Sequence, residues 1–217
     1  MRTSNLRNIA AAMAGKGRIG LAVALSALMM QPALACGKHR HAKLSTEPAR
    51  AKLSPELERA RNVLAKYKDP VTAVRDGYFS TLGCVHYKEG AMGVHFLNPA
   101  LISTKLDPDK PQILVYEPKG DQLELVAAEW FVPLATGVEA RPSLFGRPFD
   151  GPMAGHEPLM PESLHHYDLH VWLFKENPKG IFSNTNPNVS CENYSYSFLE
   201  APPATVAHHG AGHGHTK

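Results

Sequence analysis

A histidine in each of two apolar segments and a glutamate in a third have the clearest capacity for chemistry in this sequence. They are His95 in "MGVHFL", Glu129 in "QLELVAAEWF" and His170 in "DLHVWLF". Asp168 and His166 precede His170 at steps of two residues. Two imidazoles and one carboxylate are a common ligand set for Zn²⁺ and for non-haem iron. The sequence therefore predicts a divalent-metal site that draws on these five residues.

Strand geometry limits how these side chains can converge. Residues at i and i+2 of a strand lie roughly 7 Å apart on one face, so Asp168 can share a site with His166 or with His170. His166 and His170 lie about 13 Å apart on a regular strand and can share an ion only if the segment bends. Because no diagnostic spacing such as H-E-x-x-H links the candidates, a second interpretation stays open. In it, His95 and His170 hydrogen-bond to Glu129 as a structural polar network.

The elements that must position these side chains are helices first and strands afterwards. Ser54 followed by Pro55 predicts a helix start, and Asp69-Pro70 predicts a second, short helix that ends at Gly77. Beyond Gly77 the apolar period becomes extended, and "KGD" between two apolar runs predicts a hairpin. We therefore expect an α+β fold, with N-terminal helices followed by a mainly antiparallel sheet or small open barrel.

The segment that contains Glu129 predicts a central strand. Both of its faces are apolar toward the C-terminal end, which is typical of a strand covered on both sides. Glu129 is then buried, and a buried carboxylate needs a cation, a metal or a network of donors. Residues 134–163 follow, rich in proline and glycine and without periodicity. They predict a long structured loop, which we expect to cover the mouth of the pocket.

The N-terminus has the three-part layout of a secretory signal. Residues 1–35 have basic residues and no acid, then a short apolar run, then "QPALAC". A short membrane anchor is the alternative. "ALAC" is similar to a bacterial lipobox, so Cys36 is a candidate for lipidation, against a freely released protein. The sequence thus predicts an exported protein, in the periplasm, on the outer membrane as a lipoprotein, or extracellular. A lipid on Cys36 is the one membrane contact that we expect.

The other two cysteines are Cys84 and Cys191. In an oxidising compartment they can form a disulfide, with two buried free thiols as the alternative. Such a long loop adds about 3 to 5 kcal/mol to stability in the chain-entropy model.

Beyond the leader, residues 36–53 are polar and aperiodic, and the last residues of the chain are low in complexity. Residues 36–53 predict a tether, residues 54–200 a single α+β domain, and residues 201–217 a disordered tail. The tail contains four histidines, which can chelate Cu²⁺, Ni²⁺ or Zn²⁺ weakly without a fold: His208, His209, His213 and His215. The alternative is a solvated tail whose metal affinity has no biological use.

Composition and motifs exclude several classes of function. The formal net charge is +3, but the leader holds four basic residues and no acid, so the rest of the chain is close to neutral. Without a basic stripe, we expect no nucleic-acid partner. The sequence has no G-x-S-x-G and no glycine-rich phosphate loop.

Several motifs together resemble a family of exported bacterial proteins that is described as hypothetical. They are "DGYFSTLGCV", "MGVHFLNP", "LDPDKPQILVYEP", "EWFVP" and "HYDLHVWLFKENPKGIFSNTNPNVSC". The resemblance covers residues 67–191. It implies one exported bacterial domain and supplies no activity and no catalytic residues.

The function that we expect is a cell-envelope protein that binds a divalent metal, or a small ligand, in the His/Glu pocket. Zn, Cu, Ni and Fe all suit the ligands. One alternative is a small metalloenzyme in which the metal activates water or oxygen and Glu129 or Asp168 is a ligand or general base. The other is a structural or partner-binding envelope module without a metal.

Overall fold

The structure is a computed structural model of the chain and describes residues 52–207, all of which belong to one compact unit. The predicted signal peptide, Cys36, nearly all of the tether and the four tail histidines lie outside these residues. Within the described part of the chain, no helix has the length and apolar character needed to cross a membrane. The elements in chain order are α1 (Pro55–Leu64), η1 (Ala65–Lys68), α2 (Pro70–Arg75), β1 (Phe79–Tyr87), β2 (Gly90–Leu97), η2 (Pro99–Leu101), β3 (Ile113–Lys119), β4 (Gln122–Pro133), η3 (Leu134–Thr136), β5 (Ser143–Leu144), β6 (Arg147–Pro148), β7 (Asp150–Met153), β8 (His166–Val171) and β9 (Ser197–Leu199).

The two predicted helix starts are confirmed. The Ser54 hydroxyl accepts a hydrogen bond from the Leu57 backbone N–H at 3.3 Å and caps α1. The Asp69 carboxylate caps α2 in the same way, through the Val71 N–H at 3.0 Å. Such caps satisfy donors that the first turn leaves unpaired. Helix α1 then buries one stripe, formed by Leu57, Ala60 and Leu64.

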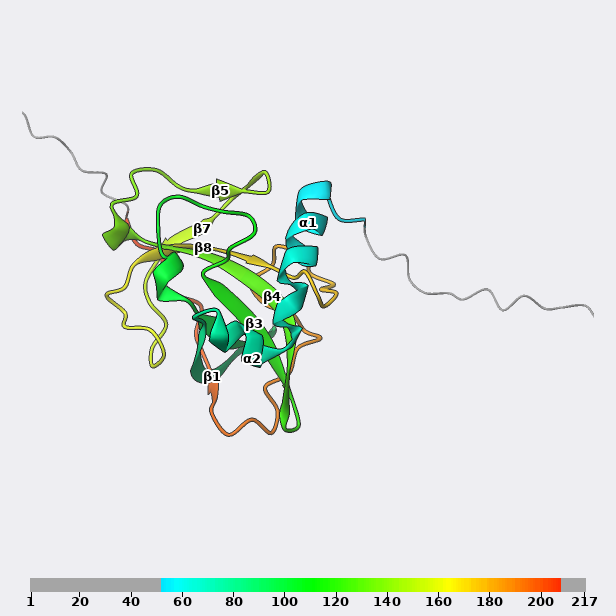
Figure 1. Ribbon diagram of the computed structural model, residues 1–217. Coiled ribbons are helices and arrows are strands. Elements are labelled where there is room, and N and C mark those ends of the chain that lie inside the picture. The colour runs from blue at the N-terminus through cyan, green and yellow to red at the C-terminus, as the bar shows by residue number, and fades with distance from the viewer. Residues whose placement is uncertain (1–51, 208–217) are drawn as a thin grey trace, which may run out of the picture. The chain divides into compact units, whose positions relative to one another are not determined.

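A curled seven-stranded sheet dominates the fold, in the order β7-β8-β4-β3-β2-β1-β9. Every neighbouring pair is antiparallel except β1 and β9, which are parallel. Figure 1 shows α1 and α2 against one side of β3 and β4. The chain is thus α+β in the broad sense, with more sheet than helix.

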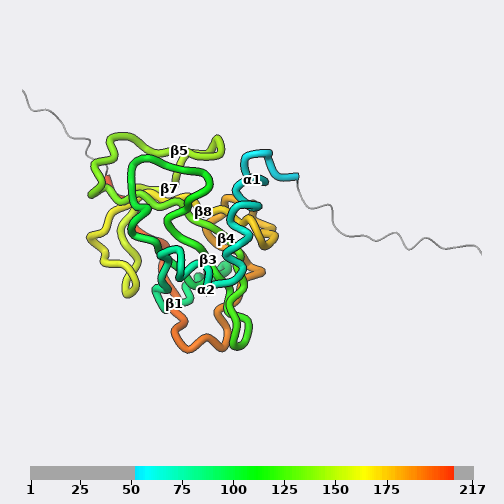
Figure 2. Tube along the Cα trace, in the orientation of Figure 1, coloured from blue at the N-terminus to red at the C-terminus, as the bar shows by residue number. Residues whose placement is uncertain are grey.

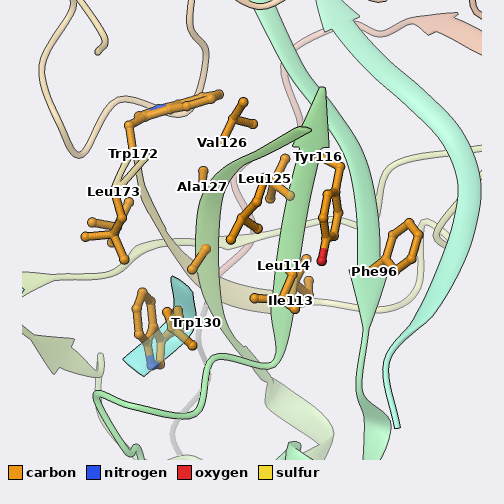
Figure 3. Packing of buried hydrophobic residues seen from close by; sticks show 14 of the residues in the cluster. Phe96, Ile113, Leu114, Tyr116, Leu125, Val126, Ala127, Trp130, Trp172 and Leu173 are labelled. Carbon is orange, nitrogen blue, oxygen red and sulfur yellow. The ribbon is translucent and has the colours of Figure 1, made fainter. Parts of the chain in front are cut away.

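The core between helices and sheet is apolar and closely packed. Tyr116 of β3 reaches across it and donates a hydrogen bond to the Tyr67 carbonyl at 2.8 Å. Its ring lies 4.7 Å from that of Phe96, and Figure 3 shows both side chains on neighbouring strands. Trp130 is fully buried, and its indole N–H donates to the Asp107 carbonyl at 2.9 Å. These contacts fix one face of β3 and β4, so the opposite face is free to hold a site.

Cys84 of β1 forms a disulfide with Cys191, across 107 residues of sequence. The pairing that the sequence left open is therefore present. It holds the C-terminal segment where β9 can pair with β1, and Figure 2 shows the red-orange end of the chain beside β1. A disulfide is compatible with an oxidising, exported location.

Two sequence boundaries are corrected by the structure. The predicted loop 134–163 contains the short strands β5, β6 and β7. The predicted disordered tail begins too early, because residues 204–206 pair with β7 and the residue after it. The Ala154 N–H donates to the Ala204 carbonyl at 2.9 Å, and the Val206 N–H donates to the Pro152 carbonyl at 3.0 Å. Three residues, Ala204, Thr205 and Val206, are too few to show a strand period in the sequence.

Candidate metal centre

The face of the sheet away from the helices brings together His95, Glu129 and His170. One ligand atom from each lies within 4.8 Å of the other two. His95 Nε2 is 3.3 Å from Glu129 Oε2, and His170 Nδ1 is 3.8 Å from the same oxygen. The two imidazole rings meet edge to face, with centroids 6.2 Å apart. Within residues 52–207, no other set of three or more His, Cys, Asp or Glu side chains has this geometry.

Strand register explains why these three side chains meet. Glu129 of β4 lies directly opposite His170 of β8, so both point to the same face. His95 is on β2, with β3 between it and β4. Two strand spacings amount to roughly 10 Å in a flat sheet. The curl of the sheet brings the His95 side chain across this span to Glu129.

Several buried polar atoms of this group have no hydrogen-bond partner within the described residues. They are both ring nitrogens of His170 and Oε2 of Glu129. The 3.3 Å contact of Glu129 with His95 is therefore an electrostatic contact without hydrogen-bond alignment. A buried polar atom that lacks a partner costs about 1–3 kcal/mol. A structural hydrogen-bond network does not explain the unpaired ring nitrogens of His170. A cation between the three side chains would bind a lone pair of His170 and one of the Glu129 carboxylate.

The protonation states suit a cation ligand set. Burial alone would raise the pKa of Glu129, but contact with His95 and the nearby imidazoles outweighs it and lowers that pKa to about 2. Burial lowers the pKa of His170 to about 4, partly offset by the Glu129 charge. At neutral pH the carboxylate is ionised and His170 is neutral. These are the forms that bind metal.

The other two predicted ligands, His166 and Asp168, face the same cavity but lie outside the group of three. His166 Nδ1 is 3.0 Å from the Leu164 carbonyl, which makes Nδ1 the protonated nitrogen. Its Nε2 is 4.0 Å from Asp168 Oδ2. Burial, with the charges of Glu129 and Asp150, raises the pKa of Asp168 well above its usual value.

A second polar cluster was not predicted from the sequence. The Tyr87 hydroxyl donates to Glu200 Oε2 at 2.9 Å, and His156 Nδ1 is 3.1 Å from the same oxygen. Tyr87 and Glu200 are 113 residues apart in the chain. No local spacing signals such a cluster, because the pairing of β9 with β1 brings its members together.

The group opens onto a partly open cavity of about 220 Å³. His95 and Glu129 line one part of its wall, while His170 lies behind them against the ring of Trp172. Asp168, His156 and Glu200 line this cavity and also a larger pocket of about 610 Å³. They therefore lie where the two pockets adjoin.

Comparisons with protein-family models, curated protein sequences and solved structures found no match for this chain.

Proposed function

We propose that this protein binds one divalent transition-metal ion through His95, Glu129 and His170. The observation on which the proposal depends is the convergence of three ligand atoms within 4.8 Å, together with the buried His170 nitrogens that have no partner in the described residues. Ligands of a tetrahedral Zn²⁺ lie about 3.3 Å apart, so binding draws the group together by at most about 1.5 Å. Zn²⁺ and Fe²⁺ suit the ligand set, and Cu²⁺ and Ni²⁺ also bind imidazole.

The setting supports a role outside the cytoplasm. The Cys84–Cys191 disulfide fits an oxidising compartment, and the leader-like residues 1–35 fit export. We infer a cell-envelope or extracellular metal-binding protein whose histidine tail collects the same ions at lower affinity.

The test separates the folded site from the tail. The tail variant replaces four histidines by alanine and keeps the full chain: His208, His209, His213 and His215. It avoids a truncation at residue 201, which would remove the pairing of residues 204–206. After loading with Zn²⁺ and gel filtration, we expect elemental analysis to find one Zn²⁺ per tail variant.

His95→Ala or His170→Ala in the tail variant should leave less than about a tenth of the bound Zn²⁺, because each removes one of three protein ligands. His86→Ala is the matched control, since His86 is on strand β1 and outside the group. Retention of stoichiometric Zn²⁺ by both ligand variants would overturn the proposal.

A second candidate function, a metalloenzyme, is favoured by the cavity beside the metal group. Three protein ligands leave a coordination position for water, which a bound metal activates. Asp168 Oδ1 is buried, lines this cavity and has no hydrogen-bond partner in residues 52–207. Such a carboxyl group can accept or donate a proton beside the metal. Exchange of the metal-bound water, measured by ¹⁷O relaxation in the Mn²⁺ form, distinguishes this site from one closed by protein ligands.

A further inference from the structure

The cavity beside the metal group is mostly apolar. Six apolar side chains supply much of its wall: Leu97, Ile102, Ile113, Phe131, Leu159 and Met160. The first four belong to the sheet or follow β2, while Leu159 and Met160 come from the segment between β7 and β8. The sheet and the segment between β7 and β8 form the walls of a small chamber. The metal ligands lie on one side of it.

The ionisable side chains of this chamber are carboxyl groups and histidines. Glu129, Asp168 and Glu200 line it, together with His95, His156 and His166. No Lys or Arg is among the lining residues from the described part of the chain. The metal ion attracts an anionic ligand, but such a ligand also meets three carboxyl groups and no Lys or Arg side chain. A neutral donor atom can reach the metal without that repulsion.

The volume of the chamber indicates the size of the occupant that fits inside it. Since an apolar cavity of about 150 Å³ holds benzene, the present 220 Å³ suits a ring with a small substituent, about ten non-hydrogen atoms in all. We propose that the metal centre takes, as its exchangeable ligand, a small molecule with an apolar body and one neutral donor atom. This inference rests on the proposed metal site and adds the class of molecule that the site binds.

The test uses Co²⁺, whose visible spectrum reports ligand exchange, in the full-length tail variant. The probes are imidazole, 4-phenylimidazole and benzoate. Imidazole and 4-phenylimidazole share the neutral nitrogen donor, and only the latter fills the apolar chamber. We expect 4-phenylimidazole to bind about tenfold tighter than imidazole or more, because its phenyl ring leaves water. We expect benzoate, of similar size and anionic, to bind weaker than 4-phenylimidazole.

Met160→Gln then tests the wall. The substitution preserves the length of the side chain, and because residue 160 lies in a connecting segment, it leaves the sheet intact. The new side chain would place an amide against the phenyl ring of 4-phenylimidazole. The preference for 4-phenylimidazole over imidazole should fall several-fold, with Co²⁺ affinity unchanged. Leu199→Gln is the control, since Leu199 is 63% exposed and outside the chamber lining.

The outcomes separate the two proposals. Absence of stoichiometric Co²⁺ overturns the metal site and this inference with it. Stoichiometric Co²⁺ with no preference for 4-phenylimidazole, or with a preference for benzoate, overturns the inference alone. Equal binding of 4-phenylimidazole to the metal-free protein also overturns it, because the metal would then not hold the ligand. These readings come from the tail variant and do not depend on whether Met160→Gln folds.

Discussion

His170 is the residue whose surroundings most need an explanation. Its side chain is fully buried, both ring nitrogens lack hydrogen-bond partners in residues 52–207, and its pKa is lowered to about 4. A histidine kept neutral and unpaired inside a protein lowers the stability of the metal-free fold. The same neutral imidazole is ready to bind a metal without first losing a proton. The cost to the apo protein and the affinity for metal therefore have one structural origin.

The buried, neutral state of His170 predicts that the stability of the metal-free protein depends on pH. Below the ordinary His pKa of 6.5 the unfolded chain takes up a proton, whereas folded His170 stays neutral until about pH 4. The free energy of unfolding therefore keeps its full value above about pH 6.5 and decreases as the pH falls toward 4. At about 1.4 kcal/mol per pKa unit, His170 accounts for up to about 3 kcal/mol of this loss.

His170→Gln removes that ionisation, so its free energy of unfolding should decline less between pH 7 and 4.5 than that of the wild type. Urea unfolding with a chelator present, at steps of half a pH unit, measures the difference. His86→Gln, outside the cavity, should follow the wild type. Parallel curves for His170→Gln and wild type would contradict the account.

At the scale of single elements, much of the site could be predicted from strand alternation. The period of two placed Asp168 and His170 on one face of their strand, and the apolar surroundings of Glu129 indicated its burial. The alternation fails at a register shift in the β3–β4 ladder, where Val115 pairs with Ala127 but Tyr116 pairs with Leu125. Beyond this bulge Leu125 lies opposite Tyr116, on the helix side, and not on the Glu129 face as alternation predicts.

Long-range contacts could not be predicted in the same way. The chain between His156 and Glu200 contains no periodic signal that relates the two residues. Their contact depends on the path of the segment after β7 and on the parallel pairing of β9 with β1. The same holds for the distance between His95 and Glu129, which the curl of the whole sheet determines.

Strand β2 holds His95 in place through a close backbone approach two residues earlier. Gly93 has φ +117°, and a Cβ there would lie 2.5 Å from the Tyr116 carbonyl oxygen of β3. Gly93→Ala should therefore separate β2 from β3 and cost about 3 kcal/mol of unfolding free energy. It should also weaken Zn²⁺ binding, since His95 moves with its strand.

Gly120 provides the matched comparison. It lies in the turn between β3 and β4 with φ +62°, and a Cβ there meets nothing within 4 Å. Gly120→Ala should cost only the strain of a positive φ at a residue with a Cβ, about 1 kcal/mol of unfolding free energy. Urea unfolding and Zn²⁺ titration of both variants measure the difference. Equal losses of unfolding free energy and of Zn²⁺ affinity in the two variants would show that the close contact between the β2 and β3 backbones does not position the site.

At the scale of the whole molecule, a metal that bridges three strands must stabilise the fold, and a metal bound by the tail must not. An ion held by His95, Glu129 and His170 binds only the folded chain, since β2, β4 and β8 bring its ligands together. Tail histidines bind equally well whether the domain is folded or unfolded, so they leave the equilibrium unchanged. The temperature of unfolding thus distinguishes the two kinds of binding even in the unmodified full chain.

With free Zn²⁺ at about a hundred times its dissociation constant, the site should add about 2.7 kcal/mol, a rise in Tm of roughly 5–10 °C for a domain of this size. Calorimetry of the chelator-treated protein, before and after Zn²⁺ is added, measures that rise. His95→Ala should abolish it, whereas alanine at the four tail histidines should leave it intact. A rise that survives His95→Ala, or one that disappears with the tail histidines, would mean that the stabilising metal lies elsewhere. The group of His95, Glu129 and His170 would then not be the metal site that stabilises the fold.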